Sequence, residues 1–182
     1  MERIAVLVAS DEIPRPEHPR PLLERRHWQS LNGRWRFRAD PPGEVSDRRA
    51  GIEGGSTIIV PFAPESRLSG IARTDFMESV WYERRLEVPS LSPGDRLLLH
   101  FGAVDWHARI FIDGEEIGEH FGGTTRFAFD ITSRVRPGVT HRLSVHAVDR
   151  TRSFEQPLGK QSRQAQSYGC YYTRTTGIWQ TV

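Results

Sequence analysis

The stretch RLLLHFGAVDWHARIFIDGEEIGEH, residues 96–120, decides the fold class. It contains three short runs rich in β-branched, aromatic and aliphatic residues, a composition typical of strands. GAVDW joins the first two runs, and the pair Asp113–Gly114 between the last two is a strong hairpin signal. The stretch therefore predicts three short strands in succession.

The same pattern recurs on both sides of this stretch. Leu31, Gly33, Trp35 and Phe37 fall on one parity, and arginines occupy the other, as in a strand with one buried face. Further strands are predicted at 56–61, 80–89, 125–132, 141–149 and 171–182. Eight to ten short strands without a long helix predict an all-β sandwich of two antiparallel sheets, and a jelly roll fits the strand count best.

Length and composition favour one soluble domain. The chain has 182 residues, with 37% hydrophobic and 26% charged residues. We expect residues 1–20 to form an arm on the surface or a disordered segment, and residues 21–182 to form the sandwich. The apolar run at 4–9 is too short for a signal peptide, and no run approaches a membrane span. The lone Cys170 excludes an intrachain disulfide, so we expect a cytoplasmic protein.

Most common chemical motifs are absent from the sequence. No nucleophile elbow, phosphate-binding loop or histidine pair with metal-ligand spacing occurs, so we expect neither a cofactor nor a metal. The net charge is only +2, and acidic residues are interspersed among the basic ones, which argues against nucleic acid as a partner. Glu65 and Asp105 each stand where a strand passes into a loop; we favour turn hydrogen bonds over glycosidase chemistry for both.

Sugar recognition is the chemistry that the aromatic residues favour. Aromatic faces pack against the C–H face of a sugar, and planar polar groups bind its hydroxyls. Tyr168, Tyr171, Tyr172 and Arg174 cluster beside a long polar loop. The alternative for the tyrosines is core packing, which we favour for Trp81, Trp106 and Trp179.

Six motifs in order then resemble a known family. They are LNGRWRF, VPFAPES, VWYERRLEVP, residues 97–132 with FIDGEEIGEH, HRLSVHAVD and YTRTTGIWQTV. The chain resembles the N-terminal sugar-binding domain of glycoside hydrolase family 2, which includes β-galactosidases, β-glucuronidases and β-mannosidases. The resemblance implies that an immunoglobulin-like domain and a (β/α)₈ barrel with two catalytic glutamates follow. The fragment itself is then not an enzyme, whereas its parent is a retaining β-glycosidase.

The resemblance also implies which loops meet a substrate. These are the loop within Ser66–Ser79 and the approach to the last strand, Lys160–Arg174. Tyr171 stands where galactosidase- and glucuronidase-type members carry an aspartate that touches sugar hydroxyls, so the sugar is left open. Lys160 and Arg174 fit an anionic sugar such as a uronate, or equally a salt bridge. The candidate substrate-binding residues are Tyr171, Tyr172, Arg174, Lys160, Gln161, Arg73 and Asp75.

Two other functions stay open at this point. The domain is either an independent carbohydrate-binding module or a structural domain that only docks the barrel. In the parent, the expected partners are a β-glycoside and the missing domains of the same chain, with neither nucleic acid nor membrane. Apolar surface left exposed by missing domains would favour self-association, so a homo-oligomer is also possible.

Overall fold

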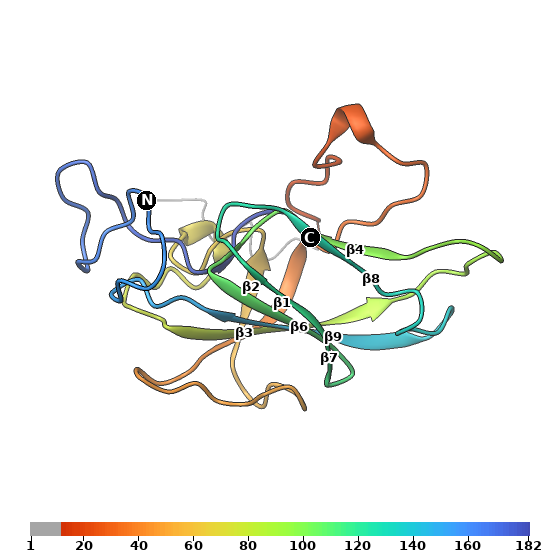
Figure 1. Ribbon diagram of the computed structural model, residues 1–182, viewed down its shortest axis with the longest axis horizontal. Helices are drawn as coiled ribbons and strands as arrows, with labels where there is room; N and C mark the ends of the chain where they lie inside the picture. Colours follow the sequence, from red (N-terminus) through yellow and green to blue (C-terminus); the bar gives the residue numbers. More distant parts are fainter. Residues whose placement is uncertain (1–11) are drawn as a thin grey trace.

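A six-stranded antiparallel sheet forms the larger layer of the protein, whose computed structural model describes residues 12–182 (Figure 1). Its strand order is β2-β1-β3-β9-β6-β7. The bounds are β2 Ser56–Val60, β1 Gly33–Ala39, β3 Ser79–Glu87, β9 Thr140–Val148, β6 His107–Ile112 and β7 Glu115–Phe121. The long central pair β3–β9 stays in register from Ser79 opposite Val148 to Glu87 opposite Thr140.

Two short strand pairs form the second layer. β4 (Leu98–Phe101) pairs with β8 (Phe127–Asp130), and β5 (Val104–Asp105) pairs with β10 (Gly177–Ile178), both antiparallel. In Figure 1, β4 and β8 lie over one face of the larger sheet. Within residues 12–182, the helical elements are two single 3₁₀ turns, η1 (Pro21–Leu23) and η2 (Arg67–Ser69). The predicted all-β antiparallel sandwich is confirmed, and the finer jelly-roll assignment stays a prediction.

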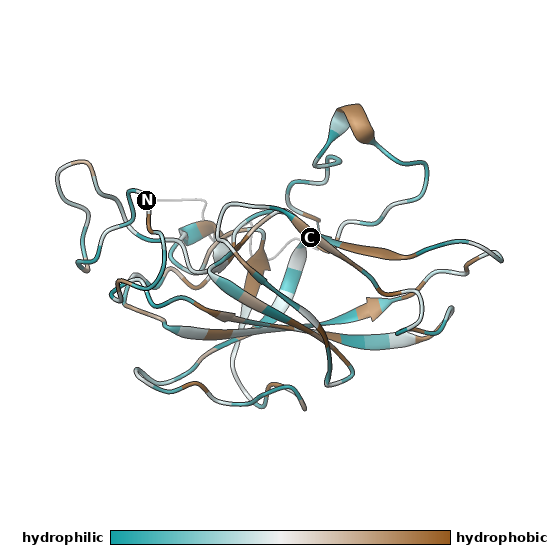
Figure 2. Cartoon of the chain, viewed as in Figure 1, coloured by the Kyte–Doolittle hydropathy of each residue, from teal (hydrophilic) through white to brown (hydrophobic). Residues whose placement is uncertain are grey.

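The main core lies between the two layers. Strand alternation places Trp35 and Phe37 of β1 and Val80 and Tyr82 of β3 on the inner face, each at most 3% exposed. Phe101 of β4 meets them from the second layer as part of the same cluster. Figure 2 shows hydrophobic residues concentrated in the strands, whereas the long loops are largely hydrophilic apart from η1.

The segment between β1 and β2 covers the opposite face of the large sheet. Ile52 packs there with Trp81 and Phe111 in a second, smaller cluster. The indole Nε1 of Trp81 donates to the carbonyl of Ser46 at 3.0 Å. Because the core covers one face of β3 and this segment covers the other, five consecutive residues of the strand, from Ser79 to Glu83, are buried.

Three local predictions met different outcomes. The Asp113–Gly114 hairpin is confirmed, with φ of 51° and 91° in the turn between β6 and β7. GAVDW was predicted as a joint, but its Val104–Asp105 forms β5. The predicted strand at 171–182 is wrong over most of its length, because β5 offers only two residues to pair with and β10 is therefore Gly177–Ile178.

The predicted arm is described only in part. Residues 1–11 lie outside the described residues. Residues 12–20 hold neither helix nor strand, and the carbonyls of Pro14 and Arg15 accept hydrogen bonds from Asn32 Nδ2 at 3.1 and 3.3 Å. In residues 12–182, no helix has both the length and the apolar character required to cross a membrane.

Candidate functional site

The two loops predicted to meet a substrate lie against each other. The guanidinium of Arg174 sits 4.0 Å from the ring centre of Phe76, which belongs to the loop before β3. The backbone N–H of Thr176 donates to Glu65 Oε2 at 3.2 Å, a second link between the same loops. Arg152 covers Phe76 at 4.6 Å and pairs with Glu78 at 2.8 Å. The approach to β10 is therefore fixed to the loop after β2.

Three buried carboxyl groups converge beneath these loops. They belong to Glu65, to Asp105 in β5 and to Asp149 at the end of β9. Burial, with a smaller contribution from the negative charge of Asp149, raises the pKa of Glu65 to about 7 despite hydrogen bonds from Thr176. Burial likewise raises the pKa of Asp105 to about 7, with the charges of Asp149 and Glu65 adding to the effect.

Asp149 is the most enclosed of the three carboxyl groups. Burial raises its pKa, while hydrogen bonds from Gln156, Thr151 and Thr176 favour its charged form. Gln156 Nε2 donates to Asp149 Oδ1 at 2.7 Å, and the Thr176 hydroxyl donates to Oδ2 at 3.1 Å. The positive charge of Arg174 also favours the ionised form of Asp149. Burial lowers the pKa of Arg174 itself, and the charges of Glu65 and Asp149 oppose that effect. The cluster thus couples β5, β9 and the approach to β10.

Glu65 and Asp105 are therefore not the turn residues that we expected. Glu65 Oε2 is bound by Thr176, far along the chain, and Asp105 Oδ2 accepts from Gln161 Nε2 at 2.7 Å. Glu65 Oε1 and Asp105 Oδ1 are buried and have no hydrogen-bond partner within the part of the chain that the structure describes. In residues 12–182, no group of three or more His, Cys, Asp or Glu side chains is arranged to hold a metal ion.

A hollow of about 360 Å³ opens within the loop that follows β9. Tyr168 and Tyr171 stack on one side of it, with ring centres 5.2 Å apart. Among the described residues that line it, Arg163 is the one cation. The lining residues are Gln156, Pro157, Leu158, Gly159, Gln161, Arg163, Tyr168 and Tyr171. An exposed aromatic pair beside a guanidinium provides the kinds of groups that sugars bind.

The candidate residues from the sequence divide over three places. Tyr171 and Gln161 line the hollow, while Tyr172 is 58% exposed and, like Lys160, stands outside the lining. Arg174, which we expected to face a ligand, is only 2% exposed.

Arg73 and Asp75 form an exposed ion pair at 2.5 Å in the other loop. The hydrogen bond from Arg73 lowers the pKa of Asp75, and the charge of Arg174 adds a smaller lowering, so this pair lies near the contact between the loops. Sequence reasoning missed Arg163 and Phe76, and no local pattern distinguished them. Of the three tryptophans, Trp81 is in the core as predicted, and Trp106 and Trp179 are partly buried.

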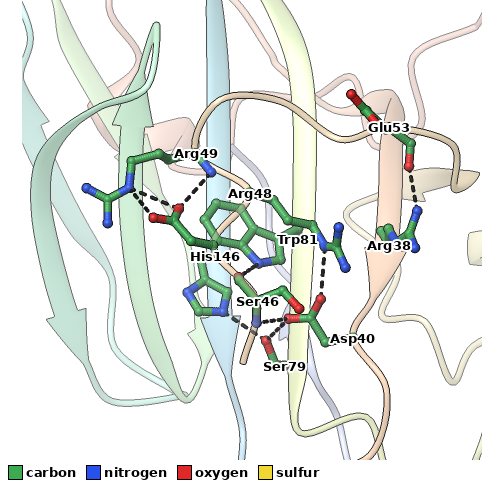
Figure 3. Close-up of polar contacts among 10 residues, drawn as sticks. Arg38, Asp40, Ser46, Arg48, Arg49, Glu53, Ser79, Trp81 and His146 are labelled. Carbon is green, nitrogen blue, oxygen red and sulfur yellow. Dashed lines mark hydrogen bonds and ion pairs between the residues drawn. The ribbon is translucent and has the colours of Figure 1, made fainter. Parts of the chain in front are cut away.

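A serine, a histidine and an aspartate also meet beneath the covering segment, as Figure 3 shows. Ser79 Oγ donates to Asp40 Oδ2 at 2.6 Å and lies 2.9 Å from His146 Nε2. The serine stands between the other two, whereas a hydrolytic triad needs the histidine in the middle. Ser79 is 1% exposed, and His146 is stacked on Trp81 with a pKa lowered by burial to about 4. This network fastens the covering segment and offers no nucleophile to a substrate.

A second hollow lies on the outer face of the large sheet, where arginines alternate along β1. Five arginines and two glutamates line it; Arg36 pairs with Glu83 at 3.1 Å, and Arg142 lies 3.8 Å from the same carboxylate. These ion pairs link β1, β3 and β9 across the outer face of the sheet.

Comparison with known proteins identifies the architecture. Residues 28–154 match the sequence profile described as glycosyl hydrolases family 2, sugar binding domain. The chain belongs to this family. It is 31% identical over 123 residues to a β-glucuronidase of Paenibacillus borealis, covering 66% of this chain and 21% of the relative. It is 35% identical over 75 residues to a β-galactosidase of Thermoanaerobacter pseudethanolicus, covering 41% and 10%.

Solved structures agree with this assignment. A Lactobacillus rhamnosus β-glucuronidase superposes with a TM-score of 0.59 at 34% identity, covering 66% of this chain and 21% of that one. A Faecalibacterium prausnitzii β-glucuronidase, at 24% identity, shows the same fold with a TM-score of 0.62 over 84% of this chain. The family 2 sugar-binding domain thus spans about a fifth of the length of the β-glucuronidases that it matches first.

Proposed function

We propose that this family 2 domain forms one wall of the substrate pocket of a longer β-glycosidase. The catalytic residues of that enzyme would lie in further domains, and hydrolysis would proceed with retention through two carboxyl groups supplied there. The proposal is supported by the family match and by the short share of each relative that the chain covers. In this chain, the role is to position and contact the sugar.

The contact between the two loops is the observation that carries the proposal. Phe76 and Arg174 pack together, and Glu65 binds Thr176, so the two segments act as one surface. Tyr171 and Gln161 reach the hollow next to that surface. Hydrogen bonds and stacked rings fix this surface before a ligand arrives, which lowers the entropy cost of binding.

The partners of the domain follow from the same proposal. The other domains of the longer protein would pack against surfaces that are apolar and exposed here, such as Leu22 and Leu23 of η1, which are 95% and 63% exposed. In the isolated chain, the same residues would favour self-association. Gel filtration of the chain beside Leu22→Ser measures this directly: the wild type should elute as a larger species.

An independent carbohydrate-binding module is the second candidate, favoured by the hollow that one loop builds by itself. Calorimetric titration with neutral β-linked oligosaccharides separates the two functions. A pocket wall that lacks its opposite side leaves sugar hydroxyls unpaired, so we expect Kd values weaker than about 1 mM. Sub-millimolar binding of a neutral oligosaccharide would overturn the pocket-wall proposal in favour of the module.

A further inference from the structure

The wall of the hollow in the loop after β9 is held in place from within. Ser162 is fully buried, and its hydroxyl contacts the carbonyls of Gln164 and Gln166 at 3.1 and 2.9 Å. Tyr168 and Tyr171 exchange backbone hydrogen bonds at 2.9 and 2.8 Å, which closes a tight turn beneath their stacked rings. The aromatic side of the hollow is therefore preorganised.

The side chains of the two glutamines that line the hollow form hydrogen bonds with other groups of the protein. Gln161 donates to Asp105 and accepts from the N–H of Thr175 at 2.8 Å. Gln156 donates to Asp149 and accepts from the N–H of Arg150 at 2.9 Å. Selection of a ligand therefore falls to the remaining polar groups of the lining, which are the tyrosine hydroxyls and the guanidinium of Arg163.

Arg163 is poised to receive an anion. Its guanidinium lies 4.2 Å from the ring centre of Phe154, whose side chain is 85% exposed. Within residues 12–182, no carboxylate forms an ion pair with it. The stretch from Gln156 to Tyr172 contains Lys160 and Arg163 but no aspartate or glutamate. The hollow thus combines an unmatched positive charge with an aromatic surface.

We propose that this hollow binds an anionic sugar residue. Its carboxylate or sulfate group would pair with the forked N–H donors of Arg163, and its ring would lie against Tyr168 or Tyr171. Phe154 holds the guanidinium by stacking, which leaves its N–H edge for the ligand. A volume of about 360 Å³ suits one small ligand. The inference rests on the proposed sugar-binding role and adds the charge of the ligand.

The position of this charge differs from the one that the sequence indicated. Arg174 was expected to meet an anionic sugar, but it is buried on Phe76 and balances Glu65 and Asp149. The exposed arginine that lines the hollow is instead Arg163, eleven residues earlier in the sequence.

Titrations of the full chain followed by NMR test the inference. The probes are methyl β-glucuronide, galactose 6-sulfate and the neutral methyl β-glucoside, with inorganic phosphate as a charge-only probe. We expect one or both anionic sugars to bind about tenfold more tightly than the glucoside, with shifts at Tyr168 and Tyr171. The two anionic probes show whether carboxylate or sulfate is preferred. Raising the salt concentration should weaken only the anionic probes.

Two matched variants make the result decisive. Arg163→Gln should reduce the affinity for the anionic sugars to that of the glucoside, whereas Arg126→Gln, an exposed arginine outside the hollow, should leave it unchanged. Equal binding of charged and neutral sugars would overturn the anion site and leave the sugar-binding proposal standing. Equal losses in both variants, or phosphate binding as tightly as the sugars, would also overturn the anion site. Absence of binding by every sugar would overturn both proposals.

Discussion

Gly177→Ala should strongly destabilise the domain, because β10 passes very close to the core. Gly177 has a φ of +70°, where an added Cβ costs about 1–2 kcal/mol. That Cβ would also lie 2.9 Å from Cε2 and Cζ of the fully buried Tyr82, and nearer still to its hydroxyl. Overpacking of this kind costs about 1–3 kcal/mol. The two effects together predict a loss of about 2–5 kcal/mol in the free energy of unfolding.

Gly138→Ala separates backbone strain from steric overlap. Gly138 has a φ of +74°, close to that of Gly177, but nothing lies within 4 Å of its added Cβ. We therefore expect this control to lose only about 1–2 kcal/mol. Urea denaturation followed by tryptophan fluorescence measures both variants, with equal m-values required for the comparison.

A double-mutant cycle then tests which atom causes the overlap. Tyr82→Phe removes the hydroxyl, the atom closest to the added methyl group. In the Tyr82→Phe background, Gly177→Ala should therefore cost about 1 kcal/mol less than in the wild type. If Gly177→Ala costs no more than Gly138→Ala, the close packing of β10 against Tyr82 is refuted.

Three further changes probe the polar clusters. The carboxyls of Glu65 and Asp105 have pKa values of about 7 in the folded state, against ordinary values of 4.5 and 3.8, so between about pH 4.5 and 7 the folded state keeps protons that the unfolded state has lost. The free energy of unfolding should therefore fall as pH rises. Asp105→Asn removes one of these carboxyls and should make the urea denaturation midpoint depend less on pH. An unchanged dependence of the midpoint on pH would contradict the raised pKa of Asp105. Arg174→Met should destabilise the fold by about 3 kcal/mol in urea, because buried carboxylates lose their cation; a loss under about 1 kcal/mol would count against it. Ser79→Ala removes the hydrogen bonds to Asp40 and His146, so it should lower the free energy of unfolding by about 1–2 kcal/mol and the thermal midpoint by a few degrees. An unchanged thermal midpoint would contradict this network.

The strands were predictable because one face of the large sheet meets the core. Alternation of Trp35 and Phe37 with arginines, and of Val80 and Tyr82 with polar residues, carries that information locally. The cover on the other face was not predictable. Trp81 is buried by a segment that is Pro-, Gly- and charge-rich, and nothing in its own strand indicates such a partner.

The last segment shows how a partner limits a strand. Its threonines and aromatic residues have high β-propensity, yet pairing stops after Ile178 because β5 is two residues long. Side-chain and terminal contacts satisfy the backbone beyond it: the Val182 N–H donates to Asn32 Oδ1 at 3.2 Å, and its carbonyl accepts from the N–H of Leu31 at 2.7 Å.

The site was predictable only at the level of loops. The resemblance pointed to the two segments that the structure brings together, and aromatic composition pointed to Tyr171. Sequence did not distinguish the buried Arg174 from the exposed Arg163, because both are arginines in polar surroundings. Which of the two lies at the surface depends on packing against Phe76, a contact between loops about 100 residues apart.

The most direct test of the central claim is to map where a β-glycoside contacts this chain. Amide NMR shifts would be followed while methyl β-galactoside, β-glucoside, β-mannoside and β-glucuronide are added up to their solubility limits. The account predicts weak, saturable shifts confined to residues 61–78 and 156–176, the two loops joined by Phe76 and Arg174. Shifts confined to the covering segment at 40–55, or no shifts with any glycoside, would contradict it.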